Sequence, residues 1–205
     1  MSDHFDVTAV TFHFDPVCPW TWRTAQWLVA AVRRRGIPLA YRAFDLSDGV
    51  PLDELPAERR PAVAGSRCLL RLAEAAHADG RDTLTGAAYA AYGAAVHDGG
   101  AAPSPELAER SLAEAGGATY ADVLHDPALD RPVARARAQA QEFSGSNAGS
   151  PVTVLTTATG ERGFFGPVLA PAPTGPDADR LWDVLAGAAS VPQFFELRAR
   201  RTAKP

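Results

Sequence analysis

The chain has 205 residues, of which 46% are hydrophobic and 21% are charged, and its formal net charge is −4. These values are typical of one large globular domain or of a domain with an insertion. They give no basis for nucleic-acid binding or for attraction to an anionic membrane, and no apolar run has the length of a bilayer-spanning helix. Residues 1–6 lack the basic and apolar regions of a signal peptide, so we expect a cytoplasmic protein whose two cysteines stay reduced.

The first elements of the chain predict a βαβ unit. Residues 7–14 are rich in β-branched and aromatic side chains, which is typical of a buried strand. Residues 18–35 carry apolar side chains at helical spacing, and Gly36 is the residue type that ends a helix. Residues 37–46 predict a second strand, and the helical connection favours a parallel pair.

The middle of the chain predicts helices without strands. Residues 53–143 are rich in Ala, Arg and Glu, with Ser104 as an expected N-cap and Pro127 as an expected helix start. The predicted helices cover residues 61–78, 83–97, 105–115, 120–124 and 128–143. A segment of this length is too long for a loop, so we expect a helical insertion over residues 49–145.

The C-terminal part returns to strands. Residues 152–156 and 162–165 predict a hairpin, followed by a Gly- and Pro-rich loop over 166–176. We expect a helix over 177–185 and a last short helix over 192–201. Residues 1–48 and 146–205 would then form one domain that the helical insertion interrupts.

Cys18 stands where the first strand gives way to the first helix, and Pro19 follows it where a helix tolerates a missing N–H. The unpaired N–H groups and the positive end of the helix dipole favour an anion there, and the available anion is a thiolate. Such surroundings lower a cysteine pKa from about 8.5 to roughly 3.5–7.5. We therefore expect a nucleophile at neutral pH; the alternative is a buried structural cysteine.

The order of the elements resembles the thioredoxin fold in its DsbA-like form. Two segments carry a closer resemblance, Phe-Asp-Pro-Val-Cys-Pro-Trp at 14–20 and Phe-Phe-Gly-Pro-Val-Leu at 164–169, followed by Leu-Trp-Asp at 181–183 and Phe-Phe-Glu-Leu at 194–197. They are similar to the actinobacterial mycothiol-dependent nitroreductase family of DsbA-like proteins, over nearly the whole chain. The resemblance implies an α/β protein with a thioredoxin-like fold and a large all-helical insertion.

The resemblance also implies roles for particular residues. Cys18 matches the nucleophile, which is the first cysteine of the family's Cys-Pro-Trp-Cys motif, and Pro151 matches its cis-proline. Ser150 would then offer backbone groups to an incoming thiol. Mycothiol is the implied small thiol, and a homodimer is the implied assembly. The second cysteine of the motif is replaced by Thr21 in this chain.

Thr21 changes the chemistry that is expected of the site. Without a cysteine three residues on, Cys18 cannot form the local disulfide of a dithiol cycle. The Thr21 hydroxyl can instead donate a hydrogen bond to the thiolate, which favours the charged form. We therefore expect a monothiol cycle that reduces a small electrophile or a disulfide: Cys18 forms a mixed disulfide with a low-molecular-weight thiol, and a second thiol releases it.

Further residues are candidates for binding the substrate. Trp20 would cover the thiol or stack on a flat substrate, and Phe165 would lie on a loop that bends toward the site. His13 either lowers the pKa of Cys18 as an imidazolium or is a core histidine, and Tyr89 either roofs the site or packs in a core. The complete candidate substrate-binding set is Pro19, Trp20, Ser150, Pro151, His13, Tyr89 and Phe165.

The remaining cysteine and histidines are weaker signals. Cys68 stands on a predicted helix face beside apolar residues and is interpreted as a small core residue, with a resolving thiol as the alternative. His77 and His97 do not have the spacing of a metal site, and we expect no metal.

Two other functions remain open from the sequence. One is a thiol transferase or isomerase that resembles the kappa-type glutathione transferases and the hydroxychromene-carboxylate isomerases, in which a hydroxyl holds the thiolate of the cofactor. The other is a non-catalytic ligand-binding protein that has lost its redox cycle. The sequence does not distinguish a nitroaromatic, a quinone and a protein disulfide as the electron acceptor.

Overall fold

The strands form one mixed sheet at the centre of the molecule. The computed structural model describes residues 7–202, so the expectation about a signal peptide at residues 1–6 lies outside the described residues. Within this range the sheet has four strands in the order β2-β1-β3-β4. They are β1 (Val7–Phe14), β2 (Leu39–Ala43), β3 (Val152–Thr157) and β4 (Gly160–Phe165). β1 pairs with β2 in parallel, as predicted, and antiparallel with β3, which forms a hairpin with β4.

The helices account for most of the remaining chain. The α-helices are α1 (Pro19–Arg35), α2 (Arg60–Ala78), α3 (Asp82–Gly93), α4 (Pro105–Glu114), α5 (Asp130–Ser144) and α6 (Gly175–Ala189). A π-helical segment, Ala94–Asp98, extends α3, and short 3₁₀ segments cover Leu52–Glu54, Ala57–Arg59, Ala118–Tyr120, Asp122–His125 and Pro127–Leu129. Two boundaries follow from local chemistry. Gly36 ends α1 with φ 65°, and the Ser104 hydroxyl caps α4 by accepting from Leu107 N.

The sheet separates two apolar layers. On one face, Phe12, Phe14 and Leu155 share a core cluster with side chains of α1 and α6. On the other face, Val152 and Val154 pack against Ala140 of α5. Alternate residues of β3 thus point to opposite faces, as the geometry of a strand requires. The continuous burial of these strands follows from their having a helix on each side.

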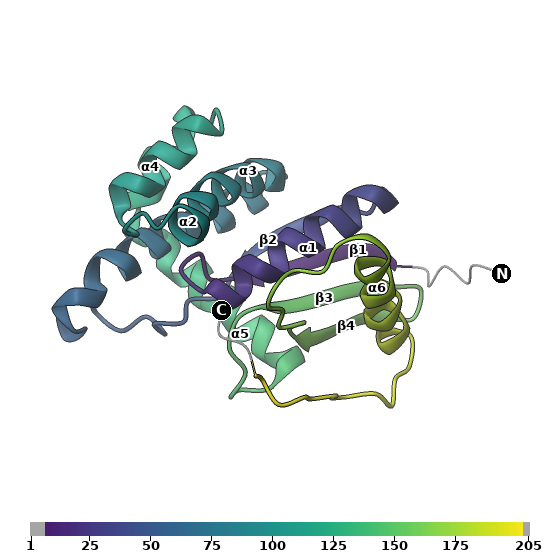
Figure 1. Ribbon diagram of the computed structural model, residues 1–205. Helices are drawn as coiled ribbons and strands as arrows, with labels where there is room; N and C mark the ends of the chain where they lie inside the picture. Colours follow the sequence, from purple (N-terminus) through teal and green to yellow (C-terminus); the bar gives the residue numbers. More distant parts are fainter. Residues whose placement is uncertain (1–6, 203–205) are drawn as a thin grey trace.

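A second core lies within the helices that connect β2 to β3. Residues of α2, α3 and α4 share this cluster, which includes Leu69, Leu72, Tyr92, Leu107 and Leu112. Figure 1 shows these helices grouped to one side of the sheet. The arrangement agrees with a thioredoxin-like fold that carries a helical insertion. The division of the chain at residues 48/49 and 145/146 stays a prediction.

Several predicted elements differ from the structure. β2 ends at Ala43 rather than at residue 46, because the Asp45 carboxylate accepts hydrogen bonds from the backbone of Ser47 and Gly49 and turns the chain. The helix predicted over 120–124 consists of 3₁₀ segments. The last helix, predicted over 192–201, is absent, because this segment packs on β4 instead through Phe194. An isolated helix of such length is marginal in water.

Candidate active site

Cys18 lies at the junction between β1 and α1. The chain turns after β1 through a hydrogen bond from Cys18 N to Asp15 O of 3.1 Å. Cys18 is the N-cap residue of α1 and Pro19 is its first residue, while Trp22 N donates to Cys18 O. The predicted position of the cysteine is therefore confirmed. Its side chain is only 8% exposed, which the sequence did not indicate.

The segment before β3 lies against this cysteine. The peptide bond between Ser150 and Pro151 is cis, as the resemblance implied. The Cys18 Sγ atom lies 3.6 Å from Ser150 O, to which the thiol donates. The fold therefore brings together Cys18 and Ser150, which are 132 residues apart in the chain, with the cis peptide bond to Pro151 beside them.

Three residues form a chain of hydrogen bonds that ends at the sulfur. Asp15 N donates to Ser150 Oγ over 3.0 Å, and Ser150 Oγ lies 2.8 Å from Thr21 Oγ1. Because the amide already donates to Ser150, the Ser150 hydroxyl hydrogen can go to Thr21. The hydrogen of Thr21 is then free for the sulfur, and this hydrogen bond lowers the pKa of Cys18. We call Asp15, Ser150 and Thr21 together the hydroxyl relay.

The expected low pKa of Cys18 is wrong. Burial raises the pKa of the thiol above its ordinary value, since taking a thiolate out of water is costly. Hydrogen bonds from the Thr21 hydroxyl and from the backbone N–H groups of Thr21 and Trp20 act in the opposite direction but do not outweigh burial. The carboxylate of Asp15 raises the pKa further. The N–H groups at the helix start therefore lower the pKa of Cys18 as predicted, but burial in the tertiary structure makes the net shift upward.

Asp15 is a buried carboxylate beside the site that sequence reasoning did not single out. Its Oδ1 accepts hydrogen bonds from Val17 N and from the Ser66 hydroxyl of α2, and its Oδ2 accepts from Leu46 N. Burial raises the pKa of Asp15 to about 6. The carboxylate joins the turn before Cys18, the loop after β2 and α2. The visible signal was an Asp three residues before the cysteine, inside the recognised motif.

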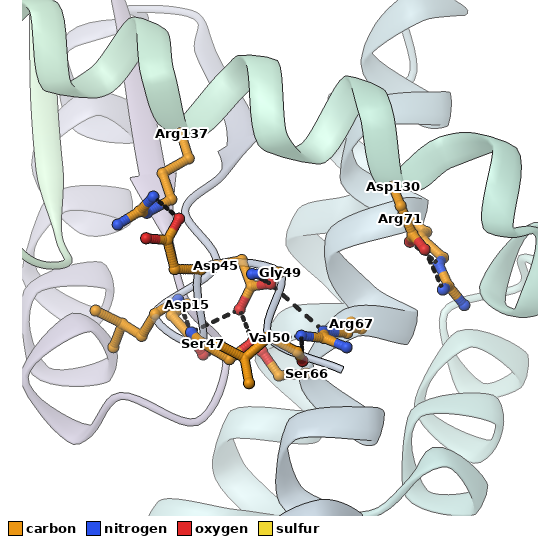
Figure 2. A network of polar contacts seen from close by, with 12 residues as sticks. Asp15, Asp45, Ser47, Gly49, Val50, Ser66, Arg67, Arg71, Asp130 and Arg137 are labelled. Atoms are coloured by element: carbon orange, nitrogen blue, oxygen red, sulfur yellow. Dashed lines mark hydrogen bonds and ion pairs between the residues drawn. The ribbon is translucent and has the colours of Figure 1, made fainter. Parts of the chain in front are cut away.

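A second carboxylate extends this arrangement toward the helices (Figure 2). Asp45 is buried and lies 3.4 Å from Arg67 Nε, and it also accepts from the Ser47 hydroxyl. Arg67 in turn donates to Val50 O. Figure 2 shows how these groups fix the loop after β2 against α2. Leu46 lies in this loop and lines the cavity beside Cys18, so the network also fixes one wall of the candidate site.

A cavity of about 230 Å³ opens beside the sulfur. Cys18 and Pro19 line it together with Asp15, Leu46, Arg59 and Val63. Small-molecule sites have volumes of about 300–1,000 Å³, so this cavity has room for the thiol-bearing end of a small molecule. Cys18 is therefore buried without being sealed from ligands.

Trp20 and Phe165 lie on the outer side of the site. Trp20 is partly buried, and Phe165 is 39% exposed and pairs in the sheet with Val152, the residue after Pro151. The Thr24 hydroxyl lies 2.5 Å from Pro167 O and so ties α1 to the loop after Phe165. The structure therefore places both aromatic rings on segments that flank the thiol.

His13 and Tyr89 have surroundings that fit packing roles. The His13 ring lies 3.5 Å from Ala43 O, and burial lowers its pKa to about 4, so it carries no charge at neutral pH. The centre of the Tyr89 ring lies 4.6 Å from the centre of the Phe14 ring of β1 and 5.5 Å from that of the Trp22 ring of α1. Within the described residues the Tyr89 hydroxyl has no hydrogen-bond partner.

Cys68 belongs to the core of the helices. It is 3% exposed, shares a cluster with Leu69 and Leu72, and is a free cysteine like Cys18. Burial raises the pKa of Cys68 to about 11, so it is protonated at neutral pH. These surroundings favour the structural interpretation of Cys68.

The π-helical segment contacts the cysteine turn, which sequence reasoning missed. His97 Nε2 lies 2.9 Å from Pro16 O, to which the ring must donate, and the His97 ring stacks on Trp22. The Trp22 indole N–H donates to the Asp98 carboxylate. A π-helical turn often accompanies a functional site. No local pattern could reveal these contacts, since 81 residues separate His97 from Pro16.

Two observations concern other classes of function. Among residues 7–202, no group of three or more His, Cys, Asp and Glu side chains is arranged to hold a metal ion. In the same part of the chain, every helix is too short or too polar to cross a bilayer.

The fold and the arrangement of Cys18 beside a cis-proline define a DsbA-like thioredoxin-fold protein. Solved structures with this fold include the cytosolic disulfide reductase DsbM from Pseudomonas aeruginosa, with a TM-score of 0.57 and 16% identity over 88% of this chain and 100% of that one. SrgA from Salmonella enterica serovar Typhimurium has a TM-score of 0.55 and 17% identity over 89% and 92%. At these identities the likeness shows the fold alone.

Sequence comparison identifies the family. The family model Rv2466c-like, described as mycothiol-dependent nitroreductase Rv2466c, matches residues 17–199. The uncharacterized protein Rv2286c of Mycobacterium tuberculosis is 33% identical over 195 residues, which cover 94% of this chain and 82% of that protein. The chain belongs to the Rv2466c-like family, which confirms the resemblance seen in the sequence. Family and fold together support a thiol oxidoreductase.

Proposed function

We propose that this protein is a thiol-dependent oxidoreductase that works through one nucleophilic sulfur, that of Cys18, and a low-molecular-weight thiol such as mycothiol. The observation that carries the proposal is the position of Thr21. Its hydroxyl stands in place of a second cysteine, 2.8 Å from the Ser150 hydroxyl, and its hydrogen bond stabilises the Cys18 thiolate. The name of the family supports mycothiol as the thiol.

The chemistry follows the balance of thiol–disulfide exchange. The Cys18 proton passes to solvent, because the thiolate is the nucleophile. The thiolate attacks the small-thiol sulfur of a mixed disulfide, the S–S bond breaks, and the substrate leaves as its thiol. A second small thiol then attacks the sulfur bound to Cys18, which restores Cys18 and releases the small thiol as its disulfide. Each cycle thus consumes one mixed disulfide and one free small thiol, and it yields the substrate thiol and the disulfide of the small thiol.

The cavity fits this cycle because it brings a small molecule to the sulfur. Its lining combines apolar side chains, Leu46 and Val63, with the charged side chain of Arg59. Thr21 and the N–H groups at the start of α1 stabilise the thiolate when it forms. The cytoplasm as compartment and a homodimer as assembly belong to the same proposal, and cell fractionation and sedimentation analysis test them.

Intact-mass spectrometry of the reduced protein after incubation with mycothiol disulfide tests the proposal. We expect a gain of one mycothiol, located on the Cys18 peptide, which added mycothiol removes. The variant Cys18→Ser is the control and should gain none. Absence of the adduct in the wild-type protein, or its displacement by Cys68, would contradict the monothiol cycle.

A transferase of the kappa type is less well supported by the geometry. Thr21 is fully buried, and Cys18 rather than Thr21 lines the cavity, so the Thr21 hydroxyl has no access to the thiol of a bound cofactor. Thiol-transferase activity that survives in Cys18→Ser and is lost in Thr21→Val would establish the transferase instead. Ligand binding without any adduct would establish a non-catalytic protein.

A further inference from the structure

The segment after α6 crosses the edge strand and returns to the active site. Arg162 of β4 donates to Phe194 O, and its guanidinium lies 5.7 Å from the centre of the Phe195 ring. The Phe194 ring meets Phe164 edge-on at 5.8 Å. Figure 1 shows this segment in yellow, running back below the sheet from the end of α6. Contacts with β4 therefore direct the end of the chain toward the start of α1.

Arg201 lies at the end of this path, on two aromatic rings of the site. Its guanidinium carbon is 5.4 Å from the centre of the Trp20 ring and 5.7 Å from the centre of the Phe165 ring. Trp20 is two residues after Cys18, and Phe165 pairs in the sheet with the residue that follows Pro151. One cation thus joins the segment that carries the thiol to the strand that pairs with β3 next to the cis-proline.

Among residues 7–202, no carboxylate forms an ion pair with Arg201. The ion pairs in this range do not include Arg198 or Arg200 either. The Arg201 guanidinium lies over both rings, and its planar fork of N–H donors matches a carboxylate in a bidentate manner. The two rings hold the group in place, which reduces the entropy cost of binding an anion.

Exposed apolar side chains lie beside the ring of Phe165 that Arg201 contacts. Phe165 is 39% exposed and Leu46 is 44% exposed, and both side chains flank Gly149, immediately before Ser150. Exposed apolar side chains next to a reactive sulfur favour a flat organic substrate over a hydrated one. A flat substrate that also carries a negative charge would contact the rings and bind the guanidinium.

We propose that Arg201, Trp20 and Phe165 form an acceptor subsite that binds an aromatic electrophile carrying a carboxylate beside Cys18. The inference rests on the proposed function and names the substrate class of the same site. Arg201 holds the carboxylate and the rings contact the aromatic part of the acceptor. The C-terminal segment is therefore part of the active site.

Two aromatic disulfides test the subsite: 5,5′-dithiobis(2-nitrobenzoate), which has a carboxylate on each ring, and 2,2′-dithiodipyridine, which is uncharged. In both reactions the Cys18 thiolate attacks a sulfur, the S–S bond breaks, and an absorbing aromatic thiolate or thione leaves. Stopped-flow absorbance gives the rate for each reagent, and peptide mass spectrometry assigns the product to Cys18. The measured quantity is the ratio of the two rates.

The variant Arg201→Gln removes the charge, and Arg198→Gln is the matched control because it removes a charge from the same segment without touching the rings. We expect Arg201→Gln to lower the rate ratio of charged to uncharged reagent about tenfold and Arg198→Gln to change it less than about twofold. Arg201→Lys keeps the charge but loses the planar fork and should lie between wild type and Arg201→Gln.

Three outcomes would overturn the inference alone while Cys18 still reacts. They are an unchanged ratio in Arg201→Gln, an equal fall in Arg198→Gln, and a faster reaction of Arg201→Gln with both reagents, which would show that the segment only covers the site. If Cys18 of the wild-type protein reacts with neither reagent, the proposed function fails together with the subsite.

Discussion

The hydroxyl oxygens of Thr21 and Ser150 lie 2.8 Å apart, although 129 residues separate them in the chain. Thr21 belongs to the helix that follows Cys18, and Ser150 precedes the cis-proline. The contact therefore joins the segment that carries Cys18 to the segment that carries Pro151. Its chemical consequence is that a hydrogen-bond donor, rather than a second sulfur, faces Cys18.

Replacing Thr21 by Val should raise the pKa of Cys18 further, because the thiolate loses a hydrogen bond from the hydroxyl while burial stays the same. A hydrogen bond to a charged group contributes about 1.5–3 kcal/mol, so we expect alkylation of Cys18 near neutral pH to slow about tenfold or more. Iodoacetamide rates measured against pH check this. Thr24→Val is the control, because the Thr24 hydroxyl contacts Pro167 O instead of the sulfur. Equal rates for Thr21→Val and wild type would contradict the hydroxyl relay.

Replacing Ser150 by Ala should lower the free energy of unfolding and should also slow the alkylation of Cys18. The Asp15 amide donates to the Ser150 hydroxyl and would lose its partner in a buried place. An unsatisfied buried donor costs about 1–3 kcal/mol, which urea unfolding measures. Combined with Thr21→Val, the variant should show a non-additive effect on the alkylation rate, since both residues act through one chain of hydrogen bonds. Additive effects would mean that they act separately.

The dependence of stability on pH should contain two opposing contributions. Burial raises the pKa of Asp15 from 3.8 to about 6, so its contribution is present below about pH 4 and is lost as the pH rises through about 6. Burial lowers the pKa of His13 from 6.5 to about 4, so its contribution is present above about pH 6.5 and is lost as the pH falls toward about 4. The two slopes overlap and partly cancel.

Replacing one of the two residues should therefore leave the pH dependence of the unfolding free energy to the other residue. In Asp15→Asn the free energy of unfolding should rise more steeply with pH than in wild type, and in His13→Gln it should fall with pH relative to wild type. From shifts of about two pKa units, we expect relative changes of about 2–3 kcal/mol between about pH 4 and pH 6.5. Urea unfolding at both pH values checks the signs. Parallel pH profiles in all three proteins would show that these groups do not titrate as described.

Replacing Gly93 by Ala should disturb the packing of Trp22. An added Cβ would lie 2.3 Å from ring atoms of Trp22, and both residues are buried. Overpacking of this kind costs about 1–3 kcal/mol, and moving the ring also weakens its hydrogen bond to Asp98. We expect a lower urea midpoint and altered tryptophan fluorescence. Gly86→Ala is the milder comparison, because its Cβ would meet only the edge of the Tyr41 side chain at 2.9 Å. A midpoint for Gly93→Ala equal to that of wild type would contradict the close approach.

Local patterns predicted most of the framework. The strand over Val7–Phe14, the start of α1 after Cys18 and its end at Gly36 depend on residues close in the chain, and all agree with the structure. The pairing of Cys18 with Pro151 needed the resemblance to a family, because nothing near either residue specifies the other. The family model and the fold confirm that resemblance.

The site could be predicted only where it depends on neighbours in sequence. The pKa of Cys18 was misjudged because burial and the carboxylate of Asp15 act through tertiary structure. The segment over 192–201 was predicted as a helix, yet its Phe194 packs on β4. The contacts of His97 with Pro16 and of Arg201 with Trp20 join distant parts of the chain, which no spacing rule covers.

The placement of the two cysteines has a consequence under oxidative stress. Peroxide converts a reactive thiolate to a sulfenic acid, which a neighbouring thiol can capture before a further oxidation becomes irreversible. Cys18 has Thr21 at that neighbouring position, and Cys68 is held protonated in the core of the helices. If Cys18 works as the proposed monothiol, rescue of the oxidised sulfur comes from a thiol supplied by the cell, and the working lifetime of the protein then depends on the thiol reserve around it.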